Sequence, residues 1–151
     1  MKFSTKSKNL EILRNLNLKK SSIPKFISVK VYEWSENSQV FKNLKRKLKD
    51  RITIRSSFFL EDNKYSSMAG EFDSFTNIKN NKKNISYYAN NLINQYKKKS
   101  VLKKHYLQSE ILFQNYIGNS SISGVVTNRC LKDGTDYYVI NYDDETQNTQ
   151  S

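Results

Sequence analysis

Residues 51–78 read RITIRSSFFLEDNKYSSMAGEFDSFTNI, and this stretch decides how the rest of the chain is interpreted. The β-branched run at 51–55 predicts a strand, and the run at 72–78 predicts a second one. Between them lies a predicted loop, 58–70, rich in hydroxyl and small residues. The first strand ends on Arg55, whose guanidinium offers a rigid fork of donors suited to phosphate oxygens. The stretch therefore fits either a surface hairpin with a polar turn or a loop that binds phosphate.

The local chemistry of Arg55 leaves both alternatives open. An arginine at a strand end is commonly ion-paired, and Glu61 or Asp62 would be its partner here. These two acids could also steer Mg²⁺, but we favour structural pairing. In the other alternative, the serines at 66–67 supply hydroxyl donors. Gly70 would let the backbone approach a ligand closely or adopt a positive φ.

Hydrophobic periodicity outside this stretch predicts alternating helices and strands. A tight turn is predicted at Asp133–Gly134, and neither an internal repeat nor a long linker is evident. The pattern predicts an α+β or α/β domain of a nucleotide-binding type. Helices are predicted over 7–16, 32–48 and 84–96, and further strands over 26–31, 109–117, 122–128 and 137–142.

Composition narrows the class of protein. The chain has 151 residues, enough for one domain with a core, and its 36% hydrophobic and 13% aromatic residues argue against disorder. No apolar run approaches the roughly 18 residues of a membrane span, and the first residues lack the apolar stretch of a secretory signal. A single cysteine, Cys130, excludes an internal disulfide and a cysteine-based zinc site. We expect a cytoplasmic protein without a membrane partner.

The net charge of +12 has three explanations. Lysine-rich runs at 43–50, 79–83 and 96–100 lie on predicted helix faces or in loops. We favour solvated lysine faces, followed by a polyanionic small ligand and then by nucleic acid.

The order of residues favours the small ligand. ITIRSS-x-x-x-E-D at 52–62, followed by S-x-A-G-x-x-D-x-F-x-N-I at 67–78, resembles the nucleotide-binding domain of the phosphoenolpyruvate synthase and pyruvate phosphate dikinase family. That family has roughly V-A-V-R-S-S-x-x-x-E-D and S-F-A-G-x-x-D-T-F-L-N-V. Residues 5–10, 23–26, 111–117 and 123–125 are similar to other family motifs, so the resemblance covers nearly the whole chain.

The resemblance implies an ATP-grasp-like fold, in which ATP lies between two α+β subdomains. We expect residues 1–142 to be the N-terminal part of such a domain, with a mixed β-sheet and flanking helices, incomplete at the C-terminus. A polar tail over 143–151 would mark a truncation point. By the same resemblance, the phosphates of ATP would be held by Lys6 and Arg55 and covered by the loop Ser66, Ser67, Met68, Ala69 and Gly70, and adenine would meet the hinge at Gln114, Tyr116 and Ile117.

The chain departs from the family pattern in places. Ser4 and Thr5 replace paired glycines, which makes Lys8 a possible substitute for Lys6. The Mg²⁺ ligands, the phosphohistidine and the acceptor domain are expected outside this sequence, so we assign no catalytic and no metal-binding residue within it. His105 and Cys130 are expected to be structural.

The stretch YYVINYDD at 137–144 resembles family members from surface-polysaccharide gene clusters. The chemistry known there is an ATP-dependent L-glutamine kinase that makes glutamine phosphate for capsule phosphoramidate. We therefore expect part of a kinase that passes phosphate from ATP, with Mg²⁺, through a phosphohistidine to L-glutamine or pyruvate, and that is inactive as this fragment alone. The alternatives are a small basic nucleic-acid-binding module, which we do not favour, and a non-catalytic remnant of the fold.

Overall fold

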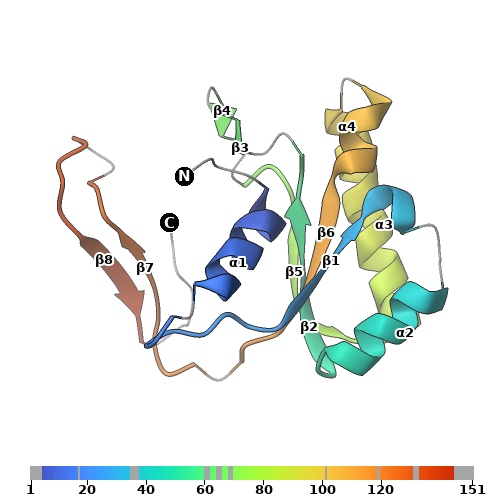
Figure 1. The fold of residues 1–151 in the computed structure, drawn as a ribbon, viewed down its shortest axis with the longest axis horizontal. Coiled ribbons are helices and arrows are strands. Elements are labelled where there is room, and N and C mark those ends of the chain that lie inside the picture. Colours follow the sequence, from blue (N-terminus) through green and yellow to red (C-terminus); the bar gives the residue numbers. More distant parts are fainter. Residues whose placement is uncertain are drawn as a thin grey trace. The chain divides into compact units, whose positions relative to one another are not determined.

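The computed structural model describes residues 5–16, 18–34, 38–59, 62–63, 66–67, 70–100, 102–118, 120–130 and 133–144. The chain divides into two compact units, residues 1–116 and 117–151. The first unit contains α1 (Lys6–Asn15), β1 (Phe26–Lys30), the 3-10 helix η1 (Val31–Glu33), α2 (Ser38–Lys47), β2 (Arg51–Ser57), β3 (Asp62–Asn63), β4 (Ser66–Ser67), β5 (Ser74–Lys79), α3 (Lys82–Lys99), α4 (Lys103–Gln108) and β6 (Glu110–Asn115) (Figure 1). The second contains β7 (Ser123–Thr127) and β8 (Val139–Asp143). The predicted α+β class is confirmed.

The main sheet has the strand order β1-β6-β2-β5. Strands β1 and β2 run in the same direction and are joined through α2, but β6 lies between them and pairs antiparallel with both. Strand β5 pairs antiparallel with β2. The sequence predicted a mixed sheet, and this was wrong for the described strands, because the insertion of β6 replaces the one parallel contact that the β1–α2–β2 crossover would otherwise make.

One face of this sheet carries the hydrophobic core. Alternation along β2 and β6 points Ile52, Ile54, Ile111 and Phe113 to the same side, and all four are fully buried. Helix α3 covers them with a stripe at helical spacing, and Leu44 of α2 and Leu48 just after α2 complete the cover. In Figure 1, α1 lies on the side of the sheet opposite to α2 and α3. The buried side chains of the α3 stripe are Ile85, Ala89, Leu92, Ile93 and Tyr96.

Helix α3 is longer than the predicted helix over 84–96. It begins after Asn81, whose side chain accepts a hydrogen bond from the backbone N–H of Asn84 at 2.9 Å. Its last turn carries Lys97, Lys98 and Lys99, which interact favourably with the C-terminal end of the helix dipole. The cap and the terminal charges extend the helix beyond its apolar stripe.

The predicted helix over 32–48 is split into η1 and α2. Trp34 lies between them, 3% exposed, with its ring centroid 5.3 Å from that of Phe41 and 5.6 Å from that of Phe113. Its indole N–H donates to the side-chain oxygen of Asn90 at 3.0 Å. Trp34, which directly follows η1, is thus packed against the sheet and against α2. Residues 35–37 are outside the described part.

Two further predictions about local structure need correction. The segment 58–70 was predicted to be a loop, but it contains the short antiparallel pair β3–β4, with Asp62 opposite Ser67 and Asn63 opposite Ser66. Helix α4 was not predicted at all, because its six residues, KKHYLQ, are too few to show a helical period.

The second unit is an antiparallel hairpin in its described part. Gly134 has φ +72°, and its N–H donates to the carbonyl of Cys130 at 2.9 Å, so the predicted turn at Asp133–Gly134 is confirmed. Strand β8 reaches Asp143, the first residue of the predicted tail, which pairs with Ser123. Residues 145–151 lie outside the described part. None of the helices described here is both long enough and apolar enough to cross a membrane.

Candidate functional site

The face of the sheet opposite the core carries the predicted arginine. Arg55 is exposed and alternates with Ile54, so its side chain belongs to the face without the hydrophobic cluster. In the β2–β6 register, Arg55 is opposite Leu112 and Thr53 is opposite Gln114. Arg55 and the half-buried Gln114 are therefore diagonal neighbours on one face. The structure brings these two predicted residues together.

Helix α1 lies over the same face and brings Lys6 to it. Ser7 is 1% exposed, and Lys6 and Leu10 are half-buried, whereas Lys8 is exposed. At the other end of the helix, the guanidinium of Arg14 lies 5.0 Å from the ring centroid of Phe26 in β1. Of the two lysines that the sequence offered, Lys6 is the one on the sheet-facing side of α1.

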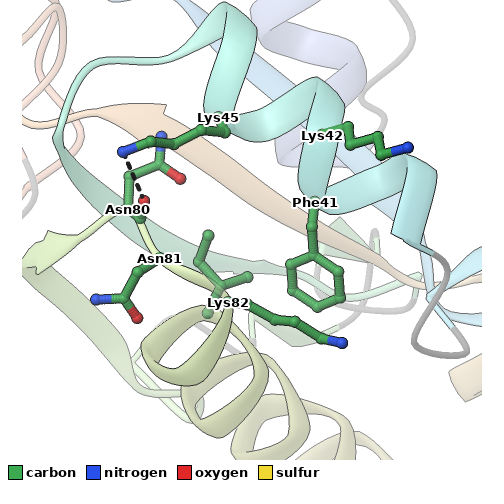
Figure 2. Close-up of a pocket in the computed structure, with 7 residues that line it drawn as sticks. Phe41, Lys42, Lys45, Asn80, Asn81 and Lys82 are labelled. Atoms are coloured by element: carbon green, nitrogen blue, oxygen red, sulfur yellow. Dashed lines mark hydrogen bonds between the residues drawn. The ribbon is translucent and has the colours of Figure 1, made fainter.

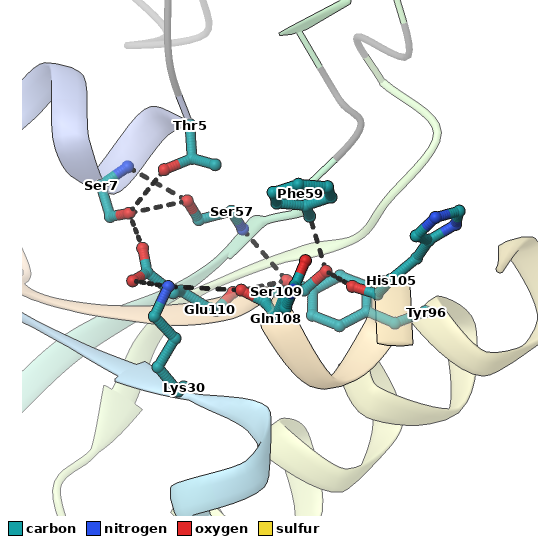
Figure 3. A network of polar contacts seen from close by, with 10 residues as sticks. All are labelled: Thr5, Ser7, Lys30, Ser57, Phe59, Tyr96, His105, Gln108, Ser109 and Glu110. Atoms are coloured by element: carbon teal, nitrogen blue, oxygen red, sulfur yellow. Dashed lines mark hydrogen bonds and ion pairs between the residues drawn. The ribbon is translucent and has the colours of Figure 1, made fainter. Parts of the chain in front are cut away.

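A buried polar network joins the start of α1 to the ends of β2 and β6 (Figure 3). The N–H of Ser7 donates to Ser57 Oγ at 3.1 Å, and Ser7 Oγ donates to a carboxylate oxygen of Glu110. Tyr96 Oη accepts from the N–H of Ser57 at 3.0 Å and donates to the carbonyl of Glu110 at 2.9 Å. The other carboxylate oxygen of Glu110 lies 2.8 Å from Lys30 Nζ. Every buried polar group named here therefore has a partner, as buried charge requires.

Sequence reasoning missed this network. Glu110 begins a strand that is otherwise apolar for three residues, and a lone acid at such a position needs a cation or a hydroxyl partner. An acid at the start of an apolar strand was therefore the one sign of the network in the sequence. The partners of Glu110 come from β1, α1 and α3, which are distant in the sequence, so no local pattern could identify them.

The loop predicted to cover the phosphates is only partly described. Ser66 and Ser67 form β4, and Gly70 is exposed with φ +80°, which confirms the positive φ considered for it. Met68 and Ala69 lie outside the described residues, as do Glu61 and the side chain of Asp62. The alternative of an ion pair between Arg55 and these acids therefore stays a prediction.

The predicted adenine hinge coincides with the boundary between the two units. Gln114 is in β6, and Tyr116 follows the strand with its N–H donating to the carbonyl of Arg51 at 3.0 Å. Ile117 is the first residue of the second unit.

A cavity of about 360 Å³ lies elsewhere, between α2 and the start of α3 (Figure 2). Lys82 Nζ is 5.6 Å from the ring centroid of Phe41, and Lys45 Nζ donates to the carbonyl of Asn80 at 3.4 Å. None of the predicted ATP-binding residues lines it. Two of its lysines, Lys45 and Lys82, belong to the runs at 43–50 and 79–83, for which we favoured solvated faces.

His105 and Cys130, the two other side chains with reactive groups, lie in a short helix and in a turn. His105 is in α4, with its ring stacked on that of Phe59 at 6.3 Å between centroids. Cys130 has backbone bonds to Thr135 and Gly134 in the hairpin turn. Over the described part of the chain, no three His, Cys, Asp or Glu side chains come close enough to hold a metal ion.

Comparison with known families identifies the family of this domain. The family model described as "Pyruvate phosphate dikinase, AMP/ATP-binding domain" matches residues 8–142. No curated protein and no solved structure gives a significant match. The matched range extends from the first turn of α1 through β2 and β6 into β8, so it includes Arg55 and Gln114 and all but the first of the predicted contact residues. The chain therefore belongs to the pyruvate phosphate dikinase AMP/ATP-binding domain family.

Proposed function

We propose that this chain binds ATP on the α1-facing side of its four-stranded sheet, as the nucleotide-binding part of a phosphoenolpyruvate synthase-like phosphotransferase. One observation carries the proposal. Arg55 and Gln114 share that face through the β2–β6 register, and Lys6 lies on the sheet-facing side of the helix above it. The nucleotide-binding role itself follows from family membership.

The donor set fits a polyphosphate. Arginine and lysine are donors only and carry positive charge, so Arg55 and Lys6 suit oxygens that accept hydrogen bonds and carry negative charge. Lys6 also begins α1, where the N-terminal end of the helix dipole favours an anion. In this proposal Gln114, Tyr116 and Ile117 border the adenine. Ser66 to Gly70 cover the phosphates, and Mg²⁺ arrives with ATP and takes its protein ligands from another part of the molecule.

The proposed reaction is transfer of a phosphoryl group. ATP supplies that group when bound, and the part of this chain is to orient the phosphates and neutralise their charge, which is the main contribution of a protein to phosphoryl transfer. We propose that a phosphohistidine elsewhere in the protein receives the phosphate and passes it to an acceptor in the cytoplasm. L-Glutamine is our first candidate for that acceptor because of the resemblance at 137–144, and pyruvate is the second.

The decisive experiment is a titration of the 151-residue chain with Mg-ATP and with ATP alone, followed by amide chemical shifts. We expect shifts around Lys6, Arg55 and Gln114. Arg55→Ala should weaken binding about ten- to a hundredfold, since a hydrogen bond to a charged group contributes about 1.5–3 kcal/mol.

Arg51→Ala is the matched control. Arg51 is on the same strand and the same face, but its guanidinium donates to the carbonyl of Asn77 at 3.1 Å. Arg51→Ala should leave the affinity for ATP unchanged. Equal losses in both variants, or equal shifts with single-stranded DNA at about 50 mM salt, would instead favour non-specific binding to a basic surface.

A further inference from the structure

We infer that Glu110 is a positioning residue for the phosphate-binding cations: acting through Ser7 and Ser57, it holds Lys6 and Arg55 in one fixed arrangement. This inference rests on the proposed function, because it assumes that Lys6 and Arg55 contact ATP.

The network connects the two cations through their nearest neighbours along the chain. Ser7 directly follows Lys6, and its N–H and Oγ both bond within the network. Ser57 lies two residues beyond Arg55 on the same face of β2 and donates from its Oγ to Ser7 Oγ at 3.0 Å. Lys6 and Arg55 are far apart in the sequence, and the network links the elements that carry them.

Helix α1 depends on this network because it has little apolar anchoring. Among its ten residues, all of which the structure describes, only Ser7 is buried. Two of its apolar side chains, Ile12 and Leu13, are 38% and 40% exposed, and Leu16 just after its last residue is 50% exposed. Thr5 caps the helix without a hydrogen bond from its side chain to the backbone. The first turn is therefore attached to the sheet mainly by hydrogen bonds.

Glu110 is the member of the network that fixes its geometry. Ser57 is held from the other side by Tyr96, so the β2 end is already rigid. The carboxylate of Glu110 is held by Lys30, directly opposite in the β1–β6 register, and is left with one oxygen for Ser7 Oγ. A charge-assisted bond to a fixed carboxylate is shorter and more directional than a bond to water, so it defines the position of Ser7 and of the adjoining Lys6.

A network that only stabilises the fold and a network that positions Lys6 should give different results when Glu110 or Ser7 is replaced. If Glu110 and Ser7 only stabilised the fold, their variants would unfold more easily but bind ATP normally while folded. If they position Lys6, the folded variants should lose affinity for ATP. The measurement must therefore separate affinity from stability.

The experiment compares Ser7→Ala, Glu110→Ala and Glu110→Gln by Mg-ATP titration, at a temperature where each variant is fully folded. We expect Ser7→Ala and Glu110→Ala to weaken ATP binding about five- to tenfold, the effect of losing about one hydrogen bond. Glu110→Gln keeps an oxygen that can accept from Ser7 Oγ, so it should recover part of the affinity that Glu110→Ala loses.

Asn81→Ala is the control matched for stability. It removes a helix cap at α3, on the core side of the sheet, so it destabilises the fold without touching the network around Glu110. It should lower the melting temperature but leave the affinity for ATP unchanged. Folded Ser7→Ala and Glu110→Ala variants that bind ATP like the unchanged chain would overturn the inference.

Hydrogen exchange distinguishes failure of this inference from failure of the proposed function. Release of α1 should speed exchange of the amides of Asn9 and Leu10 in Ser7→Ala but leave those of α3 unchanged. If the unchanged chain binds no ATP, the proposed function fails, and this exchange result still decides whether the network holds α1. Unchanged exchange in α1 would refute the anchoring role in either case.

Discussion

Asp133 illustrates how a single side chain can define a turn in this chain. Its carboxylate accepts hydrogen bonds from the N–H of Thr135 at 3.0 Å and from Thr135 Oγ1 at 2.6 Å. These bonds favour the charged form, and the hydroxyl bond is the largest cause, so the pKa of Asp133 is lowered from its ordinary value of 3.8. The same residue precedes Gly134, whose positive φ turns the chain.

Replacing Thr135 by valine should raise the pKa of Asp133 toward its ordinary value. The backbone bond remains in Thr135→Val, so only part of the lowering should disappear. A folded-state pKa below the unfolded value means that the bonds stabilise the turn above the ordinary pKa and that this contribution is lost as pH falls through the folded pKa. An NMR titration that follows the side-chain carboxyl carbon of Asp133 measures this pKa in the unchanged chain and in Thr135→Val.

Thr127→Val is the control for this titration. Thr127 Oγ1 donates to the carbonyl of Arg129 and not to Asp133, so its loss should leave the titration of Asp133 unchanged. If Thr135→Val and Thr127→Val give the same curve as the unchanged chain, the hydroxyl of Thr135 is not the cause of the lowered pKa.

At the scale of elements, the sequence predicted what depends on near neighbours and missed what depends on distant ones. The alternation in β2 and the apolar stripe of α3 are local patterns, and both elements were predicted. The split between η1 and α2 depends on where Trp34 meets Phe113, and the antiparallel sheet depends on β6 inserting between β1 and β2. Neither of these long-range contacts produces a hydrophobic period in the sequence of the segment concerned.

The hairpin of the second unit has an element-level constraint at Gly124. A Cβ placed on this residue would lie 2.7 Å from the backbone carbonyl oxygen of Asn141 on the facing strand. Backbone on a paired strand cannot move aside as a flexible side chain would. Gly124 therefore allows β7 and β8 to approach as closely as they do.

We expect Gly124→Ala to disrupt the β7–β8 pairing, at a cost of about 1–3 kcal/mol, typical of forced overpacking. The change should appear as loss of cross-strand contacts between Gly124 and Tyr142 in NMR spectra, with the signals of β2 and β6 unaffected. Val125→Ala shortens a side chain next to it without approaching the backbone, and it should leave the pairing intact. A hairpin that persists in Gly124→Ala would show that the strands can separate slightly without losing register.

At the scale of the whole molecule, the sequence proposed the residues of the candidate site one by one but not how they are arranged. Motif order identified Arg55 and Gln114 separately. Their position on one face follows from the β2–β6 register, and the place of Lys6 follows from Ser7 and Glu110. A motif records which residues a ligand needs, whereas the hydrogen bonds that hold those residues in place have to be found in the folded chain.

The two units of the chain differ in how much hydrophobic core each contains. The first unit has a four-stranded sheet covered by a hydrophobic cluster, whereas the described part of the second has a two-stranded sheet, which is marginal alone in water. A chain shortened to residues 1–116 should therefore keep a cooperative melting transition and slow hydrogen exchange at Ile111 and Phe113. Amides of β7 and β8 should exchange much faster in the full chain than those of β6.

Because Lys6 and Arg55 belong to the first unit, the shortened chain should also retain weak ATP shifts that Arg55→Ala abolishes. Loss of the melting transition on shortening would mean instead that the first unit depends on residues 117–151 for its stability, and the two units would then have to be treated as one cooperative structure.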